Sequence, residues 1–274
     1  MENDLSAQGA AVDLSWDMLK SCDYYKTVFN QSKTPIRICS DANHLPFKKD
    51  SIPFVFCYQT LHHFPDPTRI VAEIHRVLAP GGHFFFAEEP YRRFLHFSLF
   101  QGRKVYSPEA LQASGLRKVL ECFFAEKRCN EVEFGIVENE QISIRAWKQM
   151  LGIFEETKIK LCCLDYMGVE LFNPQYTSPK YYLKLALTYL LGGSVTGTCR
   201  KAGDRNPPWL PIPEALACPS CLETGRESRL EPKELSYVCS KCGNILPMMD
   251  NILFLFSDQK FKELYPGIYQ SWKK

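Results

Sequence analysis

The sequence lacks a concentrated block of basic residues, a hydrophobic run of membrane-spanning length and an N-terminal signal pattern. Its 33 Lys and Arg residues nearly balance 31 Asp and Glu residues, for a formal net charge of +2. That balance gives no electrostatic footprint for nucleic acid. The longest hydrophobic segment, residues 181–191, is too short to span a bilayer and contains Lys184. We therefore expect a cytoplasmic protein with no membrane span and no nucleic-acid partner.

The cysteines also argue against a secreted, disulfide-rich protein. Such proteins are usually short, whereas this chain has 274 residues, of which 45% are hydrophobic, enough for one main core and a smaller appendage. Four of the 12 cysteines form two Cys-x2-Cys pairs and the others are scattered. A reducing compartment and one metal site explain this pattern.

The most informative segment is a predicted β-α-β unit. The uninterrupted apolar run 52–58 predicts a strand that is buried on both faces inside a parallel sheet. Asp66-Pro67 begins a helix, Pro80 ends it, and Gly81-Gly82 supply the left-handed backbone that turns the chain back. A second buried strand covers residues 83–87. Ligands of such units bind at the carboxyl ends of the strands, and those ends carry Tyr58, His63 and Glu88.

Several short motifs around this unit occur in a familiar order: Asp41-Ala42-x-x-Leu45-Pro46-Phe47, a strand followed by Leu61-His62-His63, Asp66-Pro67, and Glu73-Ile74-x-Arg76-Val77-Leu78-x-Pro80-Gly81-Gly82. Together they resemble the central half of class I S-adenosylmethionine-dependent methyltransferases, in the small-molecule "methyltransferase type 11" group. The resemblance implies an α/β fold with a Rossmann-like sheet, S-adenosylmethionine as cofactor and a small-molecule methyl acceptor. The chain departs from the family at Ile52-Pro53, where the family usually has Phe-Asp. Proline has no backbone N–H, so the start of this strand must tolerate a missing hydrogen bond.

The resemblance also implies cofactor contacts at strand ends. Residues 10–15 read as a short strand ending in an acid, and Asp13 would accept hydrogen bonds from the ribose hydroxyls. Residues 36–39 form the next strand, after which Asp41 and Ala42 would bind the adenine. Tyr58 is a further predicted cofactor contact. The alternatives are ordinary ones: a helix cap or surface acid for Asp13 and a turn residue for Asp41.

Two side chains are candidate catalytic groups. His63 could act as a general base near neutral pH, although in the family this position shapes the loop beneath the methionine part of the cofactor. Methyl transfer also depends more on proximity and alignment than on a base. Glu88 could orient a substrate hydroxyl or amine. Only one of Glu88 and Glu89 can face the pocket, because adjacent strand residues point to opposite faces.

The glycine-rich turn that the family places before the first acid is missing. The resemblance implies a first strand and a Gly-x-Gly-x-Gly turn upstream of Asp13, but Gly9 is the only glycine before Gly81. Loss of that strand would leave the sheet amino-terminally incomplete, expose strand edges and remove half of the cofactor pocket. Either the chain is an amino-terminally shortened form, or another segment fills the gap. A second hypothesis therefore stands beside the enzyme: a catalytically inactive scaffold or regulatory subunit that binds a protein partner.

The remaining segments outline the rest of the domain. Residues 91–129 read as an aromatic substrate cover, 139–154 as a helix, 158–163 and 169–172 as a closing hairpin, and Pro179 as the start of a helix that ends at 192–193. Residues 204–213 are rich in proline and read as a stiff linker. We expect a methyltransferase-like domain over 1–200, a linker over 201–216 and a C-terminal module over 217–274.

The C-terminal module has the clearest metal signature. Its cysteines follow the pattern Cys-x2-Cys-x17-Cys-x2-Cys, formed by Cys218, Cys221, Cys239 and Cys242. Four thiolates at this spacing predict a closed, structural zinc site, with disulfide pairing as the alternative. Residues 245–254 read as two strands about an Asp-Asn turn. The module resembles the small zinc-binding activator of tRNA, rRNA and protein methyltransferases, which implies a zinc-ribbon-like fold that covers the larger domain in cis or binds a protein partner.

Overall fold

The computed structural model describes residues 7–92, 94, 97, 99–104, 112, 115–128, 139, 142–163, 167–171, 178–204 and 210–273. The chain divides into two compact units made of non-consecutive segments. The first contains Met1–Pro53, Arg76–Pro80 and Arg205–Lys274, and the second contains Phe54–His75 and Gly81–Asp204. The domain boundaries expected from the sequence follow chain continuity, and they stay a prediction.

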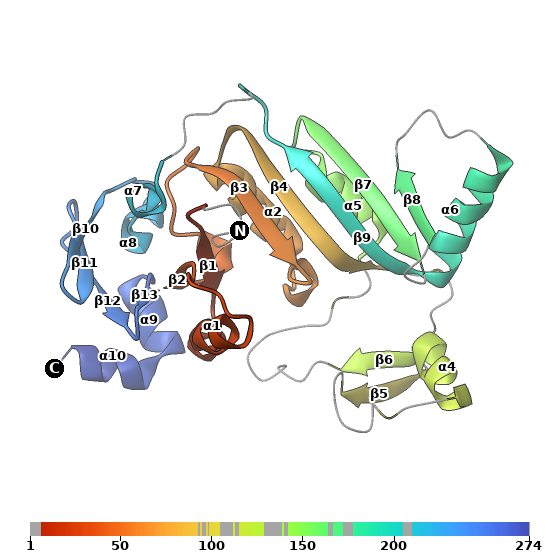
Figure 1. Cartoon of the computed structure of the whole chain (residues 1–274), viewed down its shortest axis with the longest axis horizontal. Coiled ribbons are helices and arrows are strands. Elements are labelled where there is room, and N and C mark those ends of the chain that lie inside the picture. The colour runs from red at the N-terminus through yellow and green to blue at the C-terminus, as the bar shows by residue number, and fades with distance from the viewer. Residues whose placement is uncertain are drawn as a thin grey trace. The chain divides into compact units, whose positions relative to one another are not determined.

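The first unit is built on a mixed six-stranded sheet (Figure 1), whose order is β1 (Ala10–Asp13), β2 (Ile36–Cys39), β13 (Ile252–Phe254), β12 (Ile245–Met249), β11 (Ser236–Cys239) and β10 (Leu230–Lys233). The β1–β2 and β2–β13 pairs are parallel, and the others are antiparallel. The expected strands near residues 10–15 and 36–39 are present. A strand from the C-terminal part of the chain thus extends a parallel pair from the N-terminal part.

One hydrophobic core serves both parts of this sheet. Helix α1 (Trp16–Val28) begins at Ser15, whose hydroxyl accepts the N–H of Met18, as expected. Its only buried residue, Leu19, lies in a core with five other buried side chains: Cys39, Ile252, Phe254, Phe256 and Phe261. Phe261 belongs to helix α9 (Asp258–Leu264), and helix α10 (Pro266–Trp272) adds the half-buried rings of Tyr269 and Trp272 to this core. The C-terminal segment therefore shares its core with the first two strands.

The C-terminal segment also contains the cysteine motif. Two short helices, α7 (Ile212–Ala215) and α8 (Pro219–Leu222), precede β10 and β11. The predicted turn between β12 and β13 is present, and Asp250 and Asn251 both adopt left-handed backbone, with φ of 52° and 57°. Two such residues in succession are typical of the tight turns that join antiparallel strands.

The second unit is built on a five-stranded sheet in the order β3 (Ile52–Tyr58), β4 (Leu78–Tyr91), β9 (Gly193–Arg200), β7 (Glu156–Cys163) and β8 (Met167–Leu171). Backbone bonds from Ser51 to Val77 and from Gln59 to Ala87 show that β3 and β4 run in the same direction. The β4–β9, β9–β7 and β7–β8 pairs are antiparallel, so the expected closing hairpin is confirmed.

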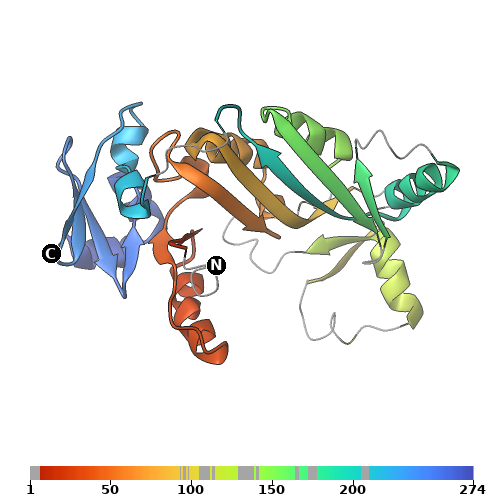
Figure 2. The same cartoon turned by 45° about the horizontal axis from the view of Figure 1, so that its top comes forward.

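Helices α2 (Pro67–Val77) and α5 (Ile144–Leu151) cover one face of this sheet (Figures 1 and 2). Trp147 of α5 stacks on Phe86 of β4 with ring centroids 5.3 Å apart, and Phe154 stacks on Phe84. These rings are buried. Their burial helps to hold α5 on the sheet, because each aromatic ring removes a large apolar area from water, while α2 buries aliphatic side chains instead, among them Ile70 and Ile74.

The structure corrects the expectation for β3. We expected an interior strand buried on both faces, but β3 is the edge strand of its sheet, with β4 as its one neighbour among the described strands. Three alternate side chains on one face, Phe54, Phe56 and Tyr58, are 40–50% exposed. The run lacks polar alternation, yet no described helix of this unit covers that face of β3, so its rings reach solvent.

Other element bounds differ from the expectations. Strand β4 starts at Leu78, directly after α2, so Pro80 and Gly82 lie within the strand, while Gly81 has the expected positive φ of 73°. Helix α5 begins at Ile144 after a Ser143 cap, later than predicted. Helix α6 (Pro179–Leu191) ends at Gly192 with φ of 74°, as predicted. Strand β9, which follows it, was not predicted.

The expected substrate cover lies partly outside the described residues. Its described elements are β5 (Phe100–Lys104), α4 (Gly115–Phe124) and β6 (Ala125–Arg128), with β5 parallel to β6. Half of the expected proline-rich linker, residues 205–209, also lies outside the described part of the chain. None of the helices that the structure describes has both the length and the hydrophobicity of a membrane-spanning helix.

Candidate functional site

Asp13 and Asp41 lie at the same edge of the first unit's sheet, and we call them the strand-tip acids. Asp13 ends β1 and pairs in parallel register with Cys39, the last residue of β2. The N–H of Ser40 donates to the Asp13 carbonyl over 3.0 Å, and Asp41 follows immediately. Because β1 and β2 are neighbouring parallel strands, their carboxyl ends bring the two acids to one edge, as the sequence predicted.

The Asp13 carboxylate organises the turn that follows it. Its Oδ1 accepts the N–H of Ser15 over 2.7 Å, which is the local turn role considered as an alternative. The residue as a whole is exposed. The protein packed around the carboxylate nevertheless limits its hydration and raises the pKa of Asp13 above its ordinary value, although the backbone N–H groups of Ser15 and Leu14 partly offset this effect.

Asp41 holds a similar local turn. Its Oδ1 accepts the backbone N–H of Asn43 over 2.9 Å and the side-chain Nδ2 of Asn43 over 2.8 Å, capping the short 3-10 helix η1 (Ala42–His44). A carboxylate has about four acceptor positions, so these bonds leave capacity for a ligand. Ala42 is half-buried. Both strand-tip acids therefore combine a structural bond with spare acceptor capacity.

The residues at this edge fit one part of S-adenosylmethionine better than the other. Carboxylates at neighbouring strand ends suit the hydroxyls of a ribose and the amino group of an adenine. A glycine turn that would let backbone approach the methionine part is not found among the described residues ahead of Gly81, where Gly9 is the only glycine. The hydrogen-bond acceptors at this edge thus fit an adenosine.

A second polar cluster, the β3–β4 tip cluster, is formed in the second unit by Tyr58, Gln59 and Glu88. Glu88 Oε2 accepts hydrogen bonds from the Tyr58 hydroxyl over 2.6 Å and from Gln59 Nε2 over 3.1 Å. Gln59 and Glu88 both adopt left-handed backbone, with φ of 46° and 55°, and the β4–β9 register shifts beside Glu88. Residues other than glycine are costly in this conformation and concentrate at functional sites.

The neighbouring Glu89 points into the protein instead. Its side chain is fully buried, where Oε1 accepts the N–H groups of Thr60 (2.7 Å) and Leu61 (2.9 Å). Oε2 accepts the N–H of His62 (3.1 Å) and lies 2.8 Å from His62 Nδ1. A buried carboxylate with four such partners is well compensated. Glu89 therefore fixes the loop that starts the 3-10 helix η2 (Leu61–His63).

The predicted site residues of this unit are only partly brought together. Tyr58 and Glu88 are in contact, whereas His63 is half-buried and packs on the His62 ring with centroids 4.1 Å apart. The sequence did not identify Gln59 or the Glu89–His62 pair as functional. Positive φ at glutamine or glutamate has no sequence signal. The roles predicted for Tyr58, His63 and Glu88 stay predictions.

The four motif cysteines converge at one point in the first unit. Their Sγ atoms all lie within 4.8 Å of one another, and Cys218–Cys242 and Cys221–Cys239 are each 3.7 Å apart. Sulfurs at about 2.3 Å from a tetrahedral zinc ion would be about 3.8 Å apart, so the spacing fits zinc. It is far longer than the bond of about 2 Å in a disulfide.

The environment of one of these sulfurs, that of Cys239, favours the ionised thiolate. Burial raises the pKa of the Cys239 thiol, but the neighbouring Ser228 hydroxyl and the N–H groups of Cys242 and Lys241 outweigh burial and lower it to about 6. Burial raises the pKa of Cys218. Without a cation, four close thiols cannot all ionise, whereas a bound zinc ion would hold all four as thiolates.

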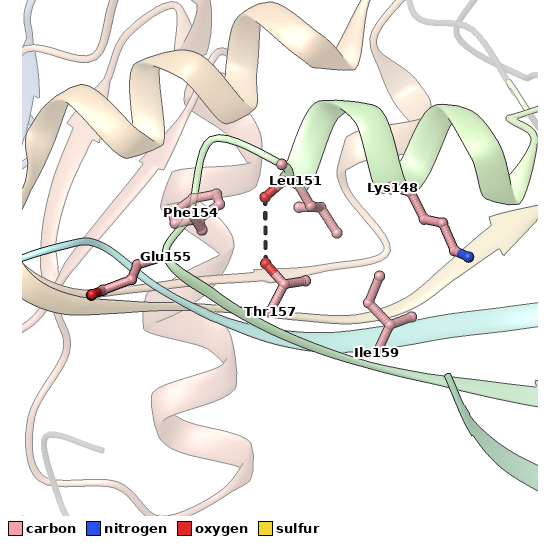
Figure 3. Close-up of a pocket in the computed structure, with 7 residues that line it drawn as sticks. Lys148, Leu151, Phe154, Glu155, Thr157 and Ile159 are labelled. Atoms are coloured by element: carbon pink, nitrogen blue, oxygen red, sulfur yellow. Dashed lines mark hydrogen bonds between the residues drawn. The ribbon is translucent and has the colours of Figure 1, made fainter. Parts of the chain in front are cut away.

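A shallow cavity of about 260 Å³ lies elsewhere in the second unit, between the end of α5 and the start of β7 (Figure 3). Lys148, Leu151, Phe154 and Ile159 line it, and Thr157 donates to the Leu151 carbonyl over 3.4 Å. Its walls are mainly apolar, and they include none of the predicted site residues. We assign it no function.

Comparison with known proteins shows that residues 2–86 match the family model described as a methyltransferase domain. Two curated relatives from Arabidopsis thaliana, both named as uncharacterized chloroplastic methyltransferases, are each 36% identical to this chain. The matches extend over 77 and 87 residues, or 27% and 30% of this chain. The matched region spans 22% and 24% of those proteins, so the chain corresponds to less than a quarter of their length.

Solved structures of low sequence identity also match. The cyclase SpnF is 15% identical, with 73% of this chain and 68% of that chain covered and a TM-score of 0.41. A chain of the complex between the Trm112 methyltransferase activator of Haloferax volcanii and a methyltransferase is 16% identical. The match covers 73% of this chain and 73% of that chain, with a TM-score of 0.40. The YcgJ protein of Bacillus subtilis is 13% identical, with 72% and 83% covered and a TM-score of 0.37.

Proposed function

We propose that this protein is an S-adenosylmethionine-dependent methyltransferase that acts on a small-molecule acceptor. The observation that carries the proposal is the placement of Asp13 and Asp41 at the ends of neighbouring parallel strands. The methyltransferase-domain match over residues 2–86 contains both acids and supports it. When bound, the cofactor supplies an electrophilic methyl group, and the task of the chain is to bind and orient.

Each predicted residue has a defined part in this proposal. Asp13 accepts the ribose hydroxyls, while Asp41 accepts the adenine amino group beside the Ala42 backbone. Tyr58 is proposed separately as a further cofactor contact, from the sequence resemblance. Glu88, which accepts the Tyr58 hydroxyl and Gln59 Nε2, is proposed to orient the methyl acceptor, and His63 is the second candidate for that role.

The test is a calorimetric titration of the full chain with S-adenosylhomocysteine, the demethylated product. The wild type should give saturable heat, and Asp13→Ala and Asp41→Ala should each weaken binding at least tenfold, because charge-assisted hydrogen bonds are lost. Asp17→Ala is the matched control, since Asp17 lies on the first turn of α1, is strongly exposed and pairs only with Lys20 among the described residues. Equal affinity in all four proteins would reject the proposed site.

We further propose that the four cysteines bind one structural zinc ion and that the C-terminal module acts in cis. The sulfur spacing of 3.7 Å supports the metal, and a four-sulfur shell leaves no open coordination position for substrate. Strand β13 of the same segment pairs with β2, whose end carries Asp41. The module would therefore stabilise the strand-tip edge rather than take part in the chemistry. We place the protein in the cytoplasm, in keeping with its free thiols.

A specific observation favours a second candidate function, a scaffold that binds another protein without cofactor. Strand β3 is an edge strand among the described strands, and the backbone of such a strand is a common site of pairing with another chain, while its exposed face carries Phe54, Phe56 and Tyr58, which a partner could cover. This candidate predicts no heat in the titration above. The methyltransferase hypothesis predicts S-adenosylhomocysteine binding that depends on Asp13.

A further inference from the structure

Tyr265, from the junction of the two C-terminal helices, reaches the turn that follows Asp13. Its hydroxyl donates to the Leu14 carbonyl and accepts the N–H of Trp16 over 3.1 Å. Leu14 and Trp16 flank Ser15, the residue whose N–H binds Asp13 Oδ1 over 2.7 Å. A side chain about 250 residues away in sequence thus bonds the backbone on both sides of the Asp13 turn.

The same hydroxyl also touches the neighbouring strand. The thiol of Cys39, the last residue of β2, lies 3.5 Å from the Tyr265 oxygen and 3.4 Å from the Leu14 carbonyl. Asp41 begins two residues later. One phenol oxygen therefore lies at the point where the carboxyl ends of β1 and β2 meet.

The half-buried ring of Tyr265 packs in an aromatic cluster. It packs against Phe254, Phe256 and Phe261, with ring centroids 5.7, 5.9 and 6.4 Å away. Phe254 belongs to β13 and is fully buried. A buried aromatic cluster fixes the hydroxyl position, because ring rotamers in a packed core are restricted.

We propose that Tyr265 is a positioning residue for nucleoside binding: its hydroxyl holds the 13–16 turn so that the Asp13 carboxylate is presented toward the ligand. This inference rests on the proposed function. It assigns to the C-terminal helices a part in the cofactor site that neither the cysteine motif nor the strand-tip sequence indicates. A group that binds through a pre-organised neighbour loses affinity when that neighbour becomes mobile.

The test compares Tyr265→Phe with Tyr269→Phe in the full chain. The first variant keeps the ring and removes only the hydroxyl. Tyr269 is the matched control, because it lies four residues away and its hydroxyl binds Asp258 over 2.6 Å, away from the Asp13 turn. Residue-resolved amide hydrogen exchange and titration with S-adenosylhomocysteine are measured for both variants and the wild type.

The proposal predicts that Tyr265→Phe accelerates exchange of the Ser15 and Trp16 amides at least tenfold and weakens the binding of S-adenosylhomocysteine about fivefold. Tyr269→Phe should change neither the exchange rates nor the affinity. Unchanged exchange at Ser15 and Trp16, or faster exchange with unchanged affinity, would overturn it. If the wild type binds no S-adenosylhomocysteine, the proposed function fails, and the exchange rates alone decide whether Tyr265 fixes the turn.

A second measurement covers the case in which Tyr265→Phe does not fold. In the wild type, the ring Hε protons of Tyr265 should show a nuclear Overhauser effect to the Trp16 amide proton, because the Tyr265 oxygen lies 3.1 Å from the Trp16 nitrogen. Absence of this effect would contradict the placement of the Tyr265 hydroxyl at the 13–16 turn, and with it the proposal.

Discussion

Glu88 and Glu89 are neighbours in the chain, yet they have opposite environments. Glu88 is exposed and binds Tyr58 and Gln59, while Glu89 is fully buried and binds backbone N–H groups. The sequence indicated that the two side chains would point to opposite faces, but it could not say which of them would be buried. The left-handed backbone at Glu88 turns that side chain out of the regular strand alternation and toward solvent.

The buried carboxylate should matter for stability far more than the exposed one. Glu89→Gln replaces an acceptor oxygen by a donor that faces backbone N–H groups, so we expect it to lower the free energy of unfolding by about 2–4 kcal/mol. Glu88→Gln, the matched control, should change it by about 0.5 kcal/mol or less, as is usual for exposed sites. Chemical denaturation measures both. Similar losses for the two variants would show that Glu89 is not the support of the 60–63 loop.

Asp13 should impose a pH dependence on ligand affinity. Its raised pKa means that the carboxylate, the form that accepts hydrogen bonds, is lost at a higher pH than for an ordinary aspartate. Affinity for S-adenosylhomocysteine should therefore be full above the raised pKa and fall as the pH drops through it. Asp13→Asn should bind more weakly and lose this acidic decline. A wild-type profile that matches Asp13→Asn would exclude Asp13 as the titrating group.

At the scale of elements, the strands differ in how well the sequence predicts them. Strands β1 and β2 and helix α1 follow from short apolar runs and the Ser15 cap. Strand β9 does not, because Gly193, Gly197 and its polar residues resemble a loop, and its pairing with β4 and β7 comes from tertiary contacts. The pairing of β13 with β2 could not be read either, since it joins segments more than 200 residues apart.

Gly197 should be essential to the contact between β9 and the core. A Cβ at this position would lie 2.6 Å from the Phe86 ring, which is fully buried and stacked on Trp147 and so cannot move aside. Gly197→Ala should lower the free energy of unfolding by about 1–3 kcal/mol. Gly267→Ala in α10 is the matched control, because a Cβ there meets nothing within 4 Å. Thermal unfolding of both variants checks this, and equal melting temperatures would contradict the packing.

At the scale of the whole molecule, the chain combines strand-tip acids and a cysteine cluster within one compact unit. The cluster was visible in the sequence because Cys-x2-Cys spacing is local. The connection between that segment and the strand tips, through the shared aromatic core, was not visible. Binding of a metal by the folded form should therefore stabilise the whole unit.

Native mass spectrometry should detect one zinc ion per chain. Cys239→Ser should lose it and unfold at a lower temperature, whereas Cys22→Ser, a thiol outside the cluster, should keep it. A strong chelator should lower the melting temperature of the wild type toward that of Cys239→Ser. Zinc retained at full stoichiometry in Cys239→Ser would contradict a four-cysteine site.

The most direct measurement is an NMR titration of the isotope-labelled full chain with S-adenosylhomocysteine, observed at the amides of Ser15 and Asn43. These N–H groups bind the Oδ1 atoms of Asp13 and Asp41, so they report on both carboxylates. Nucleoside binding at the strand tips predicts that both signals shift along one saturable curve with a common dissociation constant. Signals that stay in place at saturating ligand, or shifts confined to other parts of the chain, would contradict the account.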